Sequence, residues 1–145
     1  MSYDQERAAI EAYFNSNWSA TPVGFDDHLF TPVADSVRLK IQDGVVLQGT
    51  IGGAQNRIDH VGVLQIQIFV AGGKGSVSWR GYVETITQLF HGVIIDTSGV
   101  LITDPANAFI KFAPEGQYPY IGGNQMEPPF EIITVNAPFV RYEMM

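Results

Sequence analysis

A single lysine stands among glycines at Gly73-Lys74-Gly75, after an alternating apolar segment and before an amphipathic one. Segments of this kind bind phosphate when the spacing is G-x-x-x-x-G-K-[ST], because backbone N–H groups and the lysine contact phosphate while the hydroxyl holds Mg²⁺. Here Gly75 replaces the hydroxyl residue and Ile68 replaces the first glycine. The dinucleotide spacing G-x-G-x-x-G also fails, since Ser78 stands at the third glycine position. We interpret the segment as a flexible connection that can contact a neighbouring protein, and we expect no nucleotide site.

Oxygen and nitrogen ligands for a metal occur together at Asp26-Asp27-His28. Adjacent side chains in a loop point in different directions, however, and a metal site needs further ligands from elsewhere. The other histidines, His60 and His91, form no H-x-H or H-x-x-x-H pair, and the chain has no cysteine. We therefore expect neither a metal nor another cofactor.

Two further patterns favour catalysis only at first sight. Asp96-Thr97-Ser98-Gly99 has one residue too many for the Asp-Thr-Gly or Asp-Ser-Gly turn of aspartic proteases, and a hairpin turn explains it. No serine has the G-x-S-x-G surroundings of an activated nucleophile; the candidates considered are Ser36, Ser76, Ser78 and Ser98. We expect no catalytic residue and no enzyme activity.

The composition predicts one globular domain over residues 1–145. Hydrophobic residues make up 46% of the chain and charged residues 16%, so some apolar surface needs a partner to cover it. The formal net charge of −7 disfavours specific binding to nucleic acid. The N-terminal residues do not resemble a secretion signal, and no apolar run reaches the ~18 residues of a membrane span. These features favour a soluble assembly subunit.

Periodicity predicts two helices and several strands. A capping box of Ser2 and Gln5 begins a helix that ends near Asn17, with its apolar side chains along one face. A second helix presents a stripe to the core from Trp79 to Phe90. The apolar stripes contain Tyr3, Ile10, Phe14 and Trp18 in the first helix, and Trp79, Tyr82, Val83, Ile86, Leu89 and Phe90 in the second.

Alternation predicts the strands. Asp43-Gly44 is expected to form a type I′ turn between a strand at 37–42 and a strand at 45–51. A third strand has Leu64, Ile66, Ile68 and Val70 on one face, and a second hairpin turns at 96–99.

After the second hairpin the sequence predicts a long loop and then a final strand. The segment 105–129 reads as a loop interrupted by a short apolar piece at 109–112, and a final strand from Phe130 has Pro138 at an edge or bulge. Tyr118-Pro119-Tyr120 with Phe130 either packs on a partner or covers a small core.

The order of these pieces resembles the tail terminator proteins, also called tail completion proteins, of long-tailed bacteriophages. The resemblance extends over residues 3–143 and follows the N-terminal helix, the glycine-containing segments and the second helix. In the family a proline commonly precedes the glycine loop, where this chain has Ala71. The segments that carry the resemblance are Val37-Arg38-Leu39, Gly49-Thr50-Ile51-Gly52, Arg57, residues 62–69 and Gly73-Lys74-Gly75.

The resemblance implies an α+β fold, with two helices packed on a mostly antiparallel twisted sheet. It also implies a structural virion protein of the phage tail, assembled in the cytoplasm of the host bacterium. Such subunits form a ring, usually a homohexamer, that ends polymerisation of the tail tube and offers a surface to the head. The expected partners are further copies, the tail tube protein and the head–tail connector protein, while DNA passes through the ring without specific binding and no membrane is involved.

Glycines allow close backbone approach and arginine pairs well with a carboxylate, so we expect contacts between subunits or with the tube at two places. The residues are Arg57, Gly72, Gly73, Lys74 and Gly75. Two other functions stay open from the sequence. One is a head-to-tail adaptor or minor tail protein, and the more distant one is a small ligand-binding or hydrolytic domain with a pocket between the sheet and the 105–129 segment.

Overall fold

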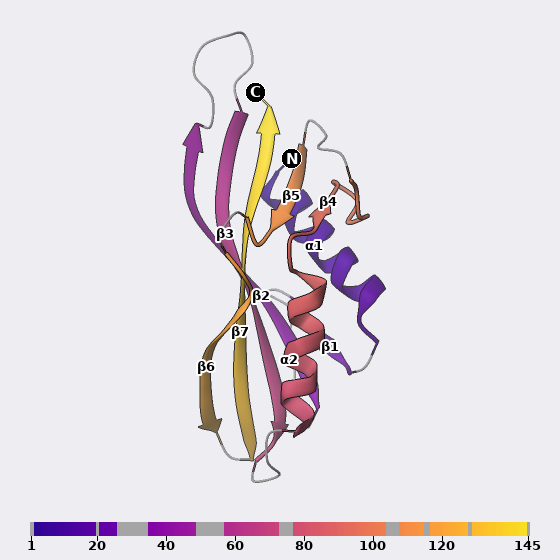
Figure 1. Cartoon of the computed structure of the whole chain (residues 1–145), viewed down its shortest axis with the longest axis vertical. Helices are drawn as coiled ribbons and strands as arrows, with labels where there is room; N and C mark the ends of the chain where they lie inside the picture. Colours follow the sequence, from indigo (N-terminus) through magenta and orange to yellow (C-terminus); the bar gives the residue numbers. More distant parts are fainter. Residues whose placement is uncertain are drawn as a thin grey trace.

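The structure is a computed structural model that describes residues 2–19, 21–25, 35–48, 57–72, 77–103, 108–114, 117–127 and 129–144. In these ranges a seven-stranded, mostly antiparallel sheet carries both helices on one of its faces, which is an α+β fold (Figure 1). The helices are α1 (Tyr3–Asn17) and α2 (Val77–Leu89). The strands are β1 (Val23–Gly24), β2 (Ser36–Gln48), β3 (Arg57–Ala71), β4 (Ile94–Ile95), β5 (Ala108–Phe112), β6 (Tyr120–Glu127) and β7 (Phe130–Met144).

The long strands β3 and β7 form the centre of the sheet. They pair antiparallel over their whole length, from Arg57 opposite Met144 to Ala71 opposite Phe130. The strand order is β1-β2-β3-β7-β5-β4, and β6 pairs with the other half of β7. The sheet twists so strongly that β2 and β6 reach the same side of the view at opposite ends of the molecule (Figure 1).

The first helix begins where the sequence predicts, and the apolar stripes of both helices pack on the core with one exception. The capping box of Ser2 and Gln5 is present in both directions, and α1 ends at Asn17. The stripe of α2 is confirmed, with Trp79 and Ile86 buried in the core. Tyr3 is the exception in α1, because its side chain is half exposed at the first turn of the helix.

The core lies between the helices and the facing side of the sheet. Alternation in β3 buries Leu64, Ile66, Ile68 and Val70 against the helices, as predicted. Gly62 allows the Phe139 ring to cross the strand, because a Cβ there would lie 2.5 Å from the ring. Aromatic rings fill the centre of the core, namely Phe14, Phe90, Phe112 and Phe139.

The type I′ turn predicted at Asp43-Gly44 is wrong. Strand β2 continues through these residues, and the register against β3 shifts by one residue between Asp43 and Val46. A Cβ on Gly44 would lie 3.1 Å from the Val61 carbonyl oxygen, so the glycine suits a bulge with close backbone approach. Continuous pairing with the long β3 outweighs the local turn preference of Asp-Gly, and the part of the predicted strand at 45–51 that follows Gln48 lies outside the described residues.

The predicted loop at 105–129 is also wrong, because it contains two strands. The apolar piece is β5, and Tyr120–Glu127 forms β6 beside β7. The glycines and asparagine of β6 have low strand propensity, so the sequence pattern did not predict a strand there. Pairing with β7 satisfies the backbone hydrogen-bonding groups on one edge of β6. The second hairpin is shorter than expected, since after the turn at Asp96 only Leu101 bridges back to Ile95.

Pro138 lies on a central strand and not on an edge strand. The expectation of an edge depended on the missing N–H of proline, and locally the strand is indeed unpaired at that N–H position. On one side of β7, pairing with β6 ends at Asn136 and pairing with β5 begins at Phe139. The Pro138 carbonyl accepts a hydrogen bond from the Ala113 N–H at 2.8 Å on that side. Because N–H and C=O of one strand residue point the same way, the N–H that proline lacks falls in the gap between β6 and β5.

Candidate functional site

Arg57 begins β3 on the sheet face away from the helices. Its guanidinium makes two hydrogen bonds to the Asp59 carboxylate, at 2.9 and 3.3 Å, and lies 5.0 Å from the centre of the Tyr142 ring. The side chain is 43% exposed, so a partner can still reach it. The bidentate carboxylate that the sequence led us to expect from a neighbouring subunit is therefore already supplied within the chain.

Gly72 lies at the other end of β3. Its N–H donates to the Pro129 carbonyl at 3.1 Å, and a Cβ there would lie 3.1 Å from the Met126 sulfur. The residue thus packs beside the β6–β7 hairpin. Gly73, Lys74 and Gly75 lie outside the described residues, as does Asp26-Asp27-His28.

Of the sequence-predicted contact residues, the two that the structure describes, Arg57 and Gly72, are not brought together. At about 3.3 Å per residue, the length of β3 places Arg57 and Gly72 roughly 50 Å apart. A single small partner cannot touch both.

Two strand segments expose apolar side chains at the borders of the sheet. In β2, Val45, Val46 and Leu47 are 49–63% exposed, and in β6, Tyr120, Ile121 and Met126 are 43–57% exposed. Among the described strands, β6 pairs only with β7, and β2 meets β1 only at Val37 and Arg38. Sequence reasoning missed both borders, because it placed a turn in β2 and a loop at β6.

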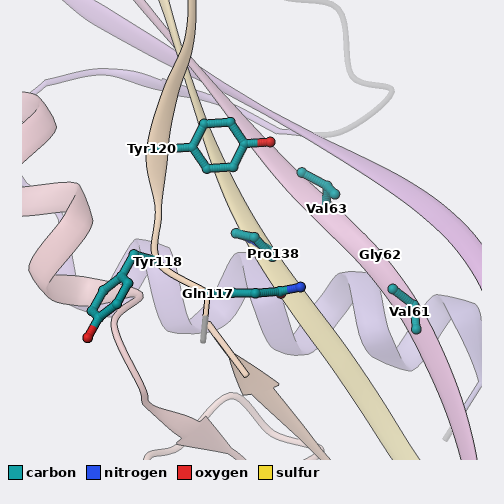
Figure 2. A pocket seen from close by; sticks show the side chains of 7 residues that line it. All are labelled: Val61, Gly62, Val63, Gln117, Tyr118, Tyr120 and Pro138. Atoms are coloured by element: carbon teal, nitrogen blue, oxygen red, sulfur yellow. The ribbon is translucent and has the colours of Figure 1, made fainter. Parts of the chain in front are cut away.

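An open hollow of about 430 Å³ lies on the face of the sheet away from the helices, where β6 begins. Figure 2 shows Tyr120 and Gln117 directed across it toward Val61 and Val63, while the Tyr118 ring points away. The Tyr118 ring instead lies 4.6 Å from the His91 ring. The lining is mostly apolar and aromatic, with Pro138 at its base.

A buried ionic cluster ties α1 to the sheet, and the sequence did not reveal it. The Arg141 guanidinium donates to Glu6 at 3.0 Å and to Glu143 at 3.4 Å, and both Arg141 and Glu6 are 1% exposed. Glu143 also lies 2.7 Å from His60 Nε2. The available signal is periodic: Glu6 precedes Ile10 by one helical turn, so a charge stands in line with the apolar stripe.

The two carboxyl groups of the cluster are shifted in opposite directions. Burial, with the neighbouring Asp43 carboxyl, raises the pKa of Glu6 from 4.5 to about 8 in spite of the Arg141 charge. Partial burial opposes ionisation of Glu143 too, but hydrogen bonding, including that of His60, holds its pKa below the ordinary value. The contribution of the cluster to stability is therefore expected to change both at alkaline pH, through Glu6, and at acid pH, through Glu143.

In the described part of the chain the cluster lacks the nucleophile that a hydrolytic site needs. His60 and Glu143 resemble the base and orienting acid of a triad, yet His60 Nδ1, where a nucleophile should bond, is buried without a hydrogen-bond partner. Within the described ranges no three His, Cys, Asp or Glu side chains are placed to hold a metal ion. Asp96 instead accepts hydrogen bonds from the backbone of Ser98 and Val100, as expected for a turn.

Comparison with known proteins supports the fold and assigns no function. No protein-family model matches the chain, and no curated protein sequence matches it. A solved structure named only by a sequence identifier superposes with a TM-score of 0.62 at 19% identity, covering 97% of this chain and 96% of that one. No helix in the described ranges has the length and hydropathy that a bilayer span requires.

Proposed function

We propose that this protein is a tail terminator subunit of a long-tailed bacteriophage. Copies form a ring, with six subunits as the expected number, on the finished tail tube in the virion. The ring ends polymerisation of the tube and gives the head–tail connector protein its docking surface. The tail tube protein is the second partner, and DNA passes through the ring without sequence-specific contacts.

The observation that carries the proposal is the pair of exposed apolar borders on one small domain, at β2 and at β6. An isolated soluble domain protects such borders with charges, prolines or covering elements. A subunit that repeats head to tail needs two different contact surfaces, one for each neighbour. The sequence resemblance supplies the identity of the assembly, and the observed fold class is the one that it implies.

The test uses purified protein, tail tubes and free tail tube protein. Added to growing tubes, the protein should stop elongation, and electron microscopy should show one ring at one end of each tube. Capped tubes should join to heads that carry the connector, whereas bare tubes should not. Unchanged tube growth with no bound ring would contradict the proposal, and binding to empty heads in preference to tubes would favour the head-to-tail adaptor.

The hollow at the start of β6 favours a second candidate, a small ligand-binding domain. It lies where residues 117–120 approach β3 and β7, and its aromatic and apolar lining is typical of small-molecule sites. Thermal melting in the presence of a library of flat aromatic and aliphatic compounds tests this function. A ligand whose stabilisation is lost in Tyr120→Ala but kept in Tyr118→Ala would support it, because only Tyr120 is directed across the hollow.

A further inference from the structure

The exposed borders of β2 and β6 lack charges and prolines, two of the features that keep strands apart, while each strand has one register shift, between Asp43 and Val46 and between Ile121 and Gly123. The segments Gly44–Gln48 and Tyr120–Met126 contain no charged residue and no proline. Their apolar side chains are exposed, and the two strands are 13 and 8 residues long, so neither is too short to pair. Natural sheets rarely leave such borders open unless another strand covers them.

The two borders occupy opposite ends of the molecule on one side. In Figure 1 the end of β2 lies at the upper left and β6 at the lower left, while both helices lie on the right. The helices therefore do not stand between these borders and an approaching chain. This arrangement leaves one border available to each of two neighbours.

The geometry points to strand addition between copies, in which the β2 segment Val45–Leu47 of one subunit pairs with the β6 segment Ile121–Gln125 of the next. This inference rests on the proposed ring and names the contact that closes it. Main-chain hydrogen bonds would give affinity, and the exposed valines, leucine and isoleucine would bury one another. Gly123, where an added Cβ would meet nothing within 4 Å, permits close approach of the incoming strand.

A second copy is the occupant that these observations favour. Pairing of β2 with β2, or of β6 with β6, would leave the other border of every subunit uncovered. Pairing of β2 with β6 covers both borders with one kind of contact, and a repeated contact between different surfaces forms a ring when its rotation closes. Each copy carries a formal charge of −7, so uncharged borders are where like-charged copies meet with least repulsion.

Cysteine cross-linking tests the pairing directly, because the natural chain has no cysteine. A double variant, Val46→Cys with Gln125→Cys, is mixed with tail tubes and treated with a short bismaleimide. The expected result is a ladder of covalent oligomers that ends at the full ring. Each single variant alone should stay monomeric on a denaturing gel, and an equal mixture of the two should give dimers only. Ser16→Cys with Gln88→Cys, on exposed positions of the helices, is the matched control and should give no ladder.

The outcomes separate this inference from the proposed function. Rings on tubes without a ladder in the double variant overturn the strand pairing and leave the ring intact. Dimers from Val46→Cys alone, or from Gln125→Cys alone, replace it with symmetric pairing. Should no ring form on tubes, the function fails, and the concentrated free protein decides the pairing: a ladder there supports it and its absence overturns it.

A charged substitution gives an independent readout. Val46→Lys places a charge on the β2 border, at a side chain that is already exposed. Rings should disappear while the melting temperature of the monomer stays unchanged. Normal rings from this variant would overturn the inference.

Discussion

At the residue scale, the buried Glu6 makes stability depend on pH. Its pKa is raised from 4.5 in the unfolded chain to about 8 in the folded one, so the folded state binds more protons between these values. Its contribution is fully present below about pH 4.5 and is lost as pH rises through about 8. Glu6→Gln should flatten the fall in unfolding free energy between those limits, measured by urea denaturation at several pH values. An equally steep fall in this variant would assign the dependence to another group.

Glu143 contributes to the acid side of the same dependence of unfolding free energy on pH. Because its pKa is lowered on folding, its contribution is present above its ordinary pKa and is lost as pH falls through the lowered value. Glu6→Gln keeps an acceptor for Arg141 and leaves Glu143 in place, so the acid limb should persist. The acid and alkaline parts of the pH dependence of unfolding free energy can thus be separated with one variant.

Trp79 is the aromatic anchor of the α2 stripe. It is 4% exposed, and Trp79→Ala should cost ~3–5 kcal/mol of unfolding free energy because it empties a packed volume. Gln88→Ala, on the exposed face of the same helix, should change stability by less than about 0.5 kcal/mol. Thermal melting compares the two variants, and equal melting temperatures would show that the indole ring of Trp79 does not stabilise the core.

Substitution of Arg57 tests whether this end of β3 contacts a neighbouring subunit, and it should leave the fold intact. Its partners, Asp59 and Tyr142, are in the same chain, and exposed ion pairs contribute about 0–1 kcal/mol. Arg57→Glu should therefore melt cooperatively yet fail to form rings, giving overlong or headless tails. Normal particles would remove Arg57 from the interface.

At the element scale, the turn after β4 docks on α1 through Gly99. Its φ is +81°, and a Cβ would lie 2.5 Å from the Ala9 carbonyl oxygen. Gly92 also has a positive φ, +68°, but open space around it, so it is the matched control. Gly99→Ala should cost about 2 kcal/mol or more, and Gly92→Ala about 1 kcal/mol, by chemical denaturation. Equal costs would mean that the turn moves away from α1 easily.

At the scale of the whole molecule, the proposed function requires that ring assembly wait for a finished tube. The free protein is therefore expected as a monomer or weak oligomer when dilute and as a ring when concentrated or on tubes, since mass action favours association. Light scattering across an approximately hundredfold dilution should show the change. A constant monomer mass, both alone and with capped tubes, would contradict this expectation.

The sequence by itself determined the elements whose signals are local. The capping box at Ser2, the stripe of α2 and the alternation of β3 each depend on residues a few positions apart, so the periodicity predicted them correctly. The α+β fold class that the family resemblance implied is the one observed. Local signals failed where a long partner strand outweighs them, as at Asp43-Gly44, where pairing with β3 carries β2 straight through a bulge.

Only the tertiary structure decided which distant residues meet. Glu6 and Arg141 lie 135 positions apart, and burial of the pair depends on how α1 packs on β7. Pro138 is compatible with a central strand only because β6 and β5 leave a gap beside it. The exposed borders of β2 and β6 are likewise products of strand order, which non-local pairing sets and no short window of sequence contains.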